Sequence, residues 1–374
     1  MPDPSKILII RPSALGDVCR SVPVLASLRR AYPEARIDWL VQDTFVDAVW
    51  YHPGLTNVVP FPRNGLAADL RRGRIDRVLG WMNRTLRGPG YDLVLDCQGL
   101  GRSGLFARWT GARVRIGYAR PEGRELSWLG VNRRVRVPPS DGPSPLHAVD
   151  RMLELVRAAG VEPVRDMRLY TGPKERAFVQ KRLDGRRYAV IAPTSRWPGK
   201  RWPADRFAAV AEALLERGTV EAVAVVGGKN ERDQCGPLLE LASRGGEATQ
   251  HAALSTQHRI LDLVGATSVG ELMAVVKSAA VVIANDSAAL HMAVGFDRPS
   301  VGLFGPTRVE LVGPYTGHAP PPSARTAVIQ HLREGDRMDH KDERGGREMM
   351  ERIGAEKVIA AAESAGSADR NCSR

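Results

Sequence analysis

Short runs of apolar and β-branched residues alternate with amphipathic helical patterns along nearly the whole chain. In the first half, helical spacing of apolar residues predicts helices over Val18–Ala31 and Leu66–Leu86. The apolar runs between and around them predict strands at Lys6–Arg11, Ile37–Val41, Asn57–Phe61, Asp92–Asp96 and Arg113–Gly117. Strands that alternate with helices are typical of a parallel sheet covered by helices, so we expect an α/β fold.

A proline-rich run, Pro138–Pro145, interrupts this series and precedes an amphipathic helix predicted over His147–Ala159. A second series follows, with helices predicted at Arg206–Glu216 and Glu271–Lys277 and strands at Tyr188–Ala192, Glu221–Val226, Arg259–Val264, Val281–Ala284 and Ser300–Phe304. We therefore expect two domains of similar size, residues 1–170 and 171–345. Beyond Pro320, Pro321 and Pro322 the chain becomes highly charged, and a last helix is expected at Glu348–Glu363, within a terminal segment, 346–374, that ends in a polar tail.

The length of 374 residues suits two to three domains, each able to bury its own core. No apolar stretch approaches the roughly 18 residues of a membrane span, because the best candidate, Met273–Ala284, is interrupted by Lys277. The N-terminus shows no export signal, so we expect a cytoplasmic protein. The cysteines Cys19, Cys97, Cys235 and Cys372 form no C-x-x-C pair, which favours reduced thiols over disulfides or a zinc site.

Lysine and arginine number 54 against 42 aspartate and glutamate, a formal net charge of +12. This excess indicates an anionic partner: nucleic acid, an anionic membrane face or a phosphorylated substrate. The net charge alone does not distinguish among these three kinds of partner. No basic stripe interleaved with aromatic residues is present, so we expect no nucleic acid as partner.

Ligands of open α/β sheets bind at the carboxyl ends of the strands, so the loops there are the candidate sites. The first, Pro12–Asp17, ends with Asp17 at the start of a helix, where it is either a capping residue or a general base. Gly16 would let the backbone turn closely there.

The second loop, Gln98–Gly104, spells G-x-G-x-x-G. A dinucleotide site also needs an acidic residue about 20 positions on, at the end of the next strand. Glu122 and Glu125 meet this only approximately. An NAD-dependent dehydrogenase is therefore the weaker alternative.

The third and fourth loops carry groups suited to anions. In Pro193–Pro203, Lys200 is either part of a solvated basic pair or a point charge for a phosphate. In Asn285–His291, a helix starting near Ser287 would offer backbone N–H groups to an anion. The alternative is a capped helix with a structural His291.

Five motifs in order resemble glycosyltransferase family 9, the ADP-heptose:lipopolysaccharide heptosyltransferases. They are RPSALGD near the N-terminus, D-x-Q-G-L-x-R-S at Asp96–Ser103, HAVDR at His147–Arg151, KRWP at Lys200–Pro203, and NDSAALHMAVGFDRPSVGLFGPT. The resemblance implies a GT-B fold, two Rossmann-like domains facing across a cleft. The N-terminal domain would bind the acceptor and the C-terminal domain the donor.

The resemblance also implies roles for individual residues. Asp17 would be the catalytic base, and Lys200 would stabilise the leaving diphosphate. Donor binding would fall to Thr194, Lys200, Glu231, Asp286, Ser287, Ala288 and His291. Acceptor binding would fall to Ser13, Gly16, Arg63, Gln98 and Arg124. Ala288 stands where the family pattern has glycine.

The implied reaction moves heptose from ADP-heptose to a hydroxyl of an anionic lipopolysaccharide core, with inversion at the anomeric carbon. A different acceptor, either protein or another glycan, or another nucleotide sugar remains the alternative within the family. No cofactor is implied, and the absence of a D-x-D pattern predicts no obligatory metal. The acceptor would lie at the cytoplasmic membrane face, which allows peripheral contact of the enzyme there. The charged segment 333–347 replaces a cysteine-rich family pattern and receives no role.

Overall fold

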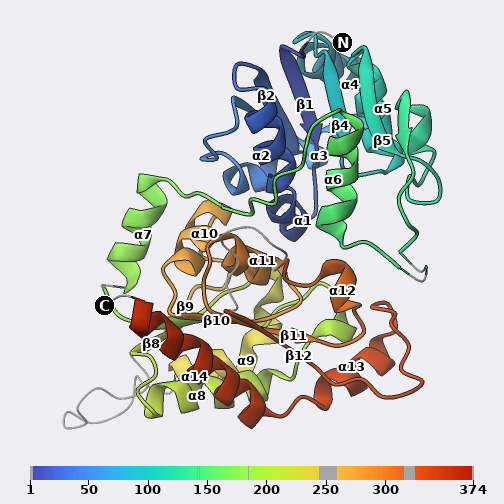
Figure 1. Ribbon diagram of the computed structural model, residues 1–374. Coiled ribbons are helices and arrows are strands. Elements are labelled where there is room, and N and C mark those ends of the chain that lie inside the picture. The colour runs from blue at the N-terminus through green and yellow to red at the C-terminus, as the bar shows by residue number, and fades with distance from the viewer. Residues whose placement is uncertain are drawn as a thin grey trace. The chain divides into compact units, whose positions relative to one another are not determined.

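The computed structural model describes residues 3–140, 142, 144–183, 185–243, 259–315 and 325–372, the last six without their side chains. The chain divides after Tyr170 into two compact units, unit 1 and unit 2, each built on its own six-stranded parallel sheet (Figure 1). Prolines 320–322, residues 141 and 143 of the proline-rich run and the side chain of Cys372 lie outside the described residues.

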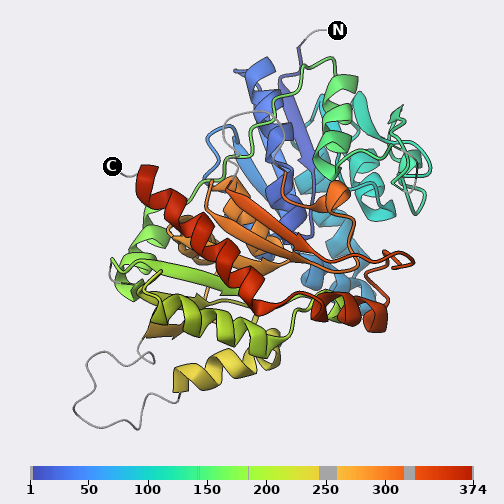
Figure 2. The ribbon, with the colours of Figure 1, turned by 60° about the horizontal axis from the view of Figure 1, so that its bottom comes forward.

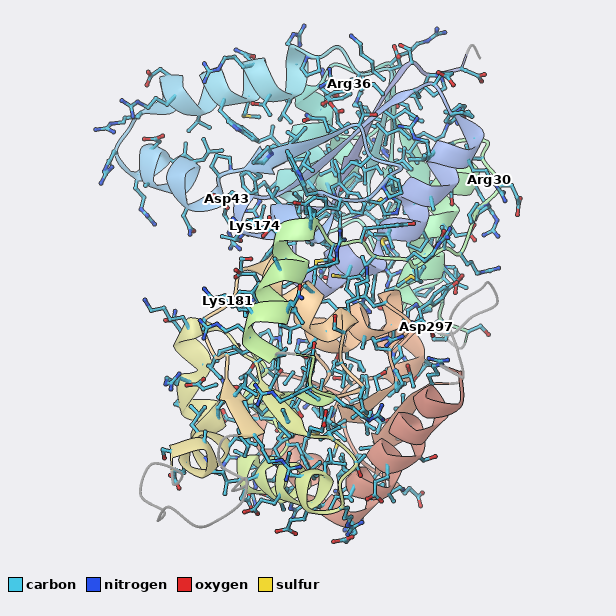
Figure 3. All side chains as sticks on the ribbon, turned by 90° about the vertical axis from the view of Figure 1, so that its left-hand side faces the viewer. Arg30, Arg36, Asp43, Lys174, Lys181 and Asp297 are labelled. Atoms are coloured by element: carbon cyan, nitrogen blue, oxygen red, sulfur yellow. The ribbon has the colours of Figure 1, made fainter. Side chains whose placement is uncertain are left out.

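The sheet of unit 1 has the strand order β3-β2-β1-β4-β5-β6, which is the Rossmann order. Its strands are β1 (Lys6–Ile10), β2 (Arg36–Gln42), β3 (Asn57–Phe61), β4 (Leu93–Asp96), β5 (Val114–Tyr118) and β6 (Arg133–Val135). The register aligns Ile10, Asp96, Gly117 and Arg134 in one row across the four strands β1, β4, β5 and β6. The carboxyl ends of all six strands therefore lie along one edge. In Figure 3, Arg36 and Asp43 label the start of β2 and the residue after its end.

The helices of unit 1 cover both faces of this sheet. They are α1 (Leu15–Arg20), α2 (Val22–Ala31), η1 (Asp43–Ala48), α3 (Arg63–Arg71), α4 (Ile75–Met82), η2 (Asn83–Arg87), α5 (Gly101–Trp109), η3 (Ser127–Leu129) and α6 (Ala148–Ala158). Leu8 and Ile10 of β1 point into a core with Met82, Leu86 and Phe106, which come from the helices α4, η2 and α5. Helices α2 and α6 contact each other, and they pack on the sheet at β2 and at β5 and β6, respectively (Figure 1).

Two predicted helices of unit 1 are each divided. The pattern at Val18–Ala31 corresponds to α1 and α2, which meet at Ser21, two residues before Pro23. The pattern at Leu66–Leu86 corresponds to α3, α4 and η2, and the first break contains Gly73 with a left-handed φ of 69°. Apolar spacing continues across both breaks, so periodicity alone did not reveal them.

Unit 2 repeats the architecture, with the order β12-β11-β10-β7-β8-β9. Its strands are β7 (Tyr188–Ala192), β8 (Ala222–Val225), β9 (Ile260–Asp262), β10 (Val281–Asn285), β11 (Ser300–Phe304) and β12 (Thr326–Gln330). Counted from β7, this is again the Rossmann order. In both sheets the first three strands are added toward one edge and the next three toward the other. The strand order therefore reverses between β1 and β4 in unit 1 and between β7 and β10 in unit 2.

The helices of unit 2 are α7 (Pro173–Leu183), η4 (Pro198–Lys200), α8 (Ala204–Glu216), η5 (Lys229–Cys235), α9 (Gly236–Ser243), α10 (Val269–Lys277), α11 (Ala288–Gly295), α12 (Val309–Val312), α13 (Glu343–Glu351) and α14 (Ala355–Cys372). Helix α14 lies against α8 and over β10 and β11 (Figure 2), where Val358 and Ile359 enter the core of unit 2. The single last helix expected at Glu348–Glu363 is therefore two helices, with Gly354 in the break.

Candidate active site

In each unit the candidate residues gather at the point where the strand order reverses. In unit 1 the RPSALGD loop follows β1 and the Gln98 loop follows β4, and these two strands are neighbours. In unit 2 the Lys200 loop follows β7 and the Asp286 loop follows β10, which are also neighbours. Loops on either side of such a reversal diverge and leave space for a ligand.

Asp17 is the third residue of α1, not its N-cap, which is Ala14. Its carboxylate accepts the Ala14 N–H at 3.3 Å and forms ion pairs with Arg11, at 3.0 Å, and with Arg20. The side chain is 27% exposed. The capping alternative is therefore met in part, since Asp17 holds the start of α1 from within the first turn.

The two arginines keep Asp17 ionised. Burial would raise the pKa of Asp17, but the charges of Arg11 and Arg20 outweigh that effect and hold the pKa well below its usual range. A carboxylate of this kind is a weak base that stays charged at every physiological pH. It can receive a proton only from an oxygen that has itself become strongly acidic.

Asp96, the last residue of β4, organises the loop that carries Gln98. Its buried carboxylate accepts N–H groups of Gln98 and Gly99, at 3.0 and 3.1 Å, and the hydroxyl of Ser103 at 2.9 Å. Burial raises the pKa of Asp96 to about 6 despite these bonds. The same loop meets the first one through the Ser13 N–H, which donates to Gln98 Oε1 at 3.4 Å.

The glycines of the G-x-G-x-x-G pattern have a packing role. A Cβ on Gly101 would lie 2.5 Å from the carbonyl oxygen of Glu125, and one on Gly104 would lie 2.5 Å from that of Ser127. Both glycines let the segment after β5 pass against the start of α5. Because this contact accounts for the glycines, the pattern is no evidence for a dinucleotide site.

The predicted acceptor residues are only partly brought together. Ser13, Gly16 and Gln98 lie in the adjoining loops after β1 and β4. The Arg124 N–H donates to the carbonyl of Gly99 at 2.9 Å, so this exposed arginine borders the same loops. Arg63 begins α3 directly after β3 and is exposed, and burial and the nearby charge of Arg63 lower the pKa of Arg102, which follows the Gln98 loop.

A hollow of about 380 Å³ at the β5–β6 end of this edge is lined by Ala119, Arg120, Trp128, Arg134 and Arg136. The guanidinium of Arg120 stacks on the Trp128 ring at 4.3 Å, and Arg134 Nε donates to the Trp128 carbonyl at 2.9 Å. Among the described residues, none of these three arginines is paired with a carboxylate. The sequence analysis did not identify this hollow, because its residues come from separate segments.

In unit 2, Lys200 and Asp286 form an ion pair. Lys200 Nζ lies 2.7 Å from Asp286 Oδ2, and the two side chains are 14% and 9% exposed. Lys200 ends the short helix η4, while Asp286 directly follows β10. Two residues predicted separately for donor binding therefore meet.

Asn285, the first residue of the fourth candidate loop, received no role from the sequence. It holds the Lys200 loop and the Asp286 loop together. Its side chain is fully buried, its Nδ2 donates to the Pro193 carbonyl at 2.7 Å, and its Oδ1 accepts the Trp202 N–H at 3.2 Å. It thereby ties the end of β10 to both sides of the Lys200 loop. An amide that ends an otherwise apolar strand was the available signal.

The start of α11 presents polar groups beside this pair. Ser287 is its N-cap, and the Ser287 hydroxyl is buried without a hydrogen-bond partner among the described residues. Ala288 is the first helical residue, so its backbone is right-handed and its methyl group brings no conformational conflict. His291 is buried one turn further on.

The other two predicted donor residues lie at the loops after β7 and β8. Thr194 is buried, and a Cβ on Gly227 would lie 2.8 Å from its methyl group. Glu231 accepts the Gly228 N–H at 2.8 Å and so closes the first turn of η5. Gln234 Oε1 accepts the Ser195 N–H at 3.1 Å and links these two loops.

The segment after β12 contributes His340 to the same surroundings. Its ring packs edge-on against Trp197, 4.9 Å between centroids. Burial and the nearby charge of Lys200 lower the pKa of His340. No sequence signal pointed to His340, because its place depends on α13 packing against η4.

No three His, Cys, Asp or Glu side chains lie close enough to hold a metal ion within the described ranges. Cys19, Cys97 and Cys235 are buried free thiols. The helices of the described residues include none that is long and apolar enough to cross a bilayer.

The sequence model of glycosyltransferase family 9 (heptosyltransferase) matches residues 80–341. Lipopolysaccharide heptosyltransferase 1 of Pseudomonas aeruginosa is 29% identical over 314 residues, which cover 83% of this chain and 81% of that protein. Among solved structures, Escherichia coli ADP-heptose lps heptosyltransferase II superposes with a TM-score of 0.73 at 20% identity, over 98% of this chain and 99% of its own. E. coli heptosyltransferase WaaC with ADP-2-deoxy-2-fluoro heptose gives 0.68 at 21% identity, over 96% and 99%.

Proposed function

The chain belongs to glycosyltransferase family 9, and we propose that it transfers a heptose from ADP-heptose to a hydroxyl of an anionic lipopolysaccharide core. It is a glycosyltransferase with the two Rossmann-like sheets of the GT-B heptosyltransferases. The observation that carries the proposed donor is the Lys200–Asp286 pair beside the N-cap of α11.

The donor is proposed to bind unit 2. A diphosphate needs a positive charge and N–H donors, which Lys200 and the first turn of α11 supply. The Ser287 hydroxyl, which has no hydrogen-bond partner in the described part of the chain, offers a further donor. Thr194, Glu231, Asp286, Ala288 and His291 are assigned to the rest of the donor, with Glu231 at the ribose. The name of the WaaC structure, which includes an ADP-heptose analogue, agrees with this choice.

The proposed chemistry is one in-line displacement at the anomeric carbon. The acceptor oxygen bonds to that carbon from the face opposite the diphosphate, the bond to the diphosphate oxygen breaks, and its electron pair leaves with ADP. This inverts the configuration. Lys200 and the N-terminus of α11 stabilise the charge that collects on the leaving group.

Asp17 receives the acceptor proton in this scheme. Because Arg11 and Arg20 hold its pKa low, transfer of the proton comes late, when bond formation has made the hydroxyl acidic. The loops that carry Ser13, Gly16 and Gln98 border Asp17 and are assigned to the acceptor sugar.

The acceptor is proposed to be anionic and to lie at the cytoplasmic face of a membrane. Support comes from the net charge of +12, from the exposed Arg63 and Arg124, and from the arginines of the hollow at the end of β5 and β6, which have no carboxylate partner among the described residues. The relative in Pseudomonas aeruginosa is named for lipopolysaccharide, which agrees with this acceptor.

The test is to incubate the enzyme with ADP-heptose and a panel of truncated lipopolysaccharide cores, neutral glycans and peptides, following ADP release and product mass. We expect transfer to the anionic cores, and a loss of about 100-fold or more in turnover for Asp17→Asn with ADP binding retained. Transfer only to a neutral glycan or a peptide would reject the lipopolysaccharide acceptor. Wild-type turnover of Asp17→Asn would remove Asp17 from the mechanism.

A further inference from the structure

Helices α3 and α4 form a surface hairpin that is attached to the core of unit 1 through the buried Met82 and the partly buried Leu66, Val78 and Trp81. Helix α3 contributes no buried residue, and α4 contributes only Met82. Residues 72–74 join the two helices, with Gly73 in the left-handed region. In Figure 3 the pale blue helices of this hairpin stand at the margin of unit 1.

The hairpin exposes large aliphatic side chains. Leu70 is 54% exposed, Ile75 56% and Leu79 39%. Ile75 and Leu79 are one helical turn apart and therefore lie on the same face of α4. Three such side chains within ten residues are unusual on a surface that meets only water, and they indicate an interface.

The same segment is strongly basic. Between positions 63 and 87 the sequence holds seven arginines, at 63, 71, 72, 74, 77, 84 and 87, against two aspartates, at 69 and 76, a net charge of +5. Asp69 forms long ion pairs with two of these arginines, at 3.8 Å with Arg74 and at 4.0 Å with Arg77. Arg71, Arg72 and Arg84 have no carboxylate partner among the described residues.

Aliphatic and cationic groups side by side match one kind of partner. The interface of an anionic bilayer accepts aliphatic side chains at the level of the headgroups and pairs arginine with their phosphates. Nucleic acid would leave Leu70, Ile75 and Leu79 without a suitable contact. We propose that the α3–α4 hairpin docks this enzyme on the surface of an anionic membrane, with Leu70, Ile75 and Leu79 among the headgroups and the arginines on the phosphates.

This docking deepens the proposed function, on which its purpose rests, because a glycolipid acceptor lies in such a surface. The hairpin directly follows β3, so it begins at the same carboxyl edge of the unit 1 sheet as the loop that leads to Asp17. Its binding to a bilayer, however, requires neither donor nor acceptor and is measured separately from transfer.

The experiment is co-sedimentation of the full chain with phosphatidylcholine vesicles that contain or lack about a third of phosphatidylglycerol. We expect binding to the anionic vesicles, weakened by salt. Arg71→Gln/Arg72→Gln should reduce it about 30-fold, at the usual contribution of a basic residue near an anionic surface. Ile75→Ser/Leu79→Ser should reduce it about 10-fold or more through lost apolar contact.

Matched controls are the double variant Arg344→Gln/Arg347→Gln on α13, with the same loss of charge, and Leu332→Ser, which removes an aliphatic side chain that is 51% exposed. Both should bind vesicles as the wild type does. Equal binding to the two kinds of vesicle, or an equal loss in the controls, would overturn the proposal.

Transfer to a soluble acceptor without lipid separates docking from acceptor binding. Ile75→Ser/Leu79→Ser should leave that turnover within about twofold of wild type, and a loss as large as the loss of vesicle binding would overturn the proposal. A chain that binds the anionic vesicles through the hairpin yet transfers heptose to no acceptor would refute the proposed function and leave the docking surface standing.

Discussion

Lys200 Nζ lies 2.7 Å from Oδ2 of Asp286, although 86 positions separate the two residues in the sequence. The pair joins the loops after β7 and β10, the two strands beside which the order of the sheet reverses. The aspartate balances the charge of the lysine. A diphosphate bound here, as proposed for the donor, would meet both groups at once.

Lys200→Ala should weaken ADP binding by about 10-fold or more and leave adenosine binding unchanged, because the lost contact is to phosphate. Asp286→Asn should keep ADP binding as tight as in the wild type or tighter, since a negative charge beside the diphosphate is removed. Titration calorimetry measures both. Lys174→Ala, on the exposed face of α7 (Figure 3), is the control and should change neither ligand. Equal losses for ADP and adenosine would disprove the phosphate contact.

Asp17 should cause no acid limb in the pH profile of kcat/KM above about pH 4, because Arg11 and Arg20 keep its pKa well below the usual range. Arg11→Gln removes one of these charges, so the pKa of Asp17 should rise and an acid limb should move up into the measured range. Profiles between pH 4 and 9 for both proteins decide this. An unchanged profile in Arg11→Gln would mean that the arginine does not control the protonation of Asp17.

Asp96 should make the stability of the protein depend on pH. Its pKa is about 6 in the folded chain, above the usual value near 3.8, so the folded state binds more protons than the unfolded state between these values. The free energy of unfolding of the wild type should therefore fall, relative to Asp96→Asn, as the pH rises from 4 to 6, by about 2 kcal/mol. Denaturant titrations at several pH values test it. A constant difference between the two proteins would contradict the raised pKa.

Gly101→Ala and Gly104→Ala should each destabilise unit 1 by roughly 1–3 kcal/mol, because the added methyl group meets a carbonyl oxygen at 2.5 Å. Gly236→Ala is the control, since a Cβ there has no neighbour within 4 Å in the described part of the chain and the residue begins a helix. That change should be neutral or stabilise by up to about 1 kcal/mol. Thermal unfolding distinguishes them, and unchanged stability of both unit 1 variants would reject the packing role.

Arg136→Ala should raise KM for a phosphorylated acceptor about 10-fold and leave KM for the same acceptor without phosphate unchanged, because the arginine lines the hollow and has no carboxylate partner in the described ranges. Arg113→Ala is the matched control: Arg113 precedes β5, at the edge opposite to the hollow. It should affect neither acceptor. Steady-state kinetics that show equal changes in both variants would exclude the hollow from acceptor binding.

The fold class and the family were predictable because both depend on short, continuous segments of the sequence. Apolar runs mark the central strands, and the family motifs lie in the loops behind them; the α/β fold and the family are confirmed. Strands β6 and β12 were missed: they lie at the edges of the sheets, where β6 is short and charged and β12 is partly exposed. Helix α5 was missed because Gly101 and Gly104, both weak helix formers, occupy its first turns.

The candidate site was predictable one residue at a time but not as an arrangement. Lys200 and Asp286 were each singled out by type and by their place after a strand, whereas their ion pair depends on β7 and β10 being neighbours. The amide that ends an apolar strand was a local signal for Asn285, but its partners Pro193 and Trp202, like the position of His340, follow from packing between distant segments. The roles assigned to Asp17, Glu231 and the acceptor residues stay predictions.

Each unit completes its own sheet and its own apolar core, so the protein is assembled from two halves that can vary separately. Under the proposed assignment, substitutions around Ser13, Gln98 and the hollow at Arg136 would change which acceptor is recognised, and the loops that hold Lys200 and Asp286 belong to the other unit. If the proposed roles hold, the acceptor-binding unit can change to accept a new sugar chain while the donor-binding unit keeps the same activated donor.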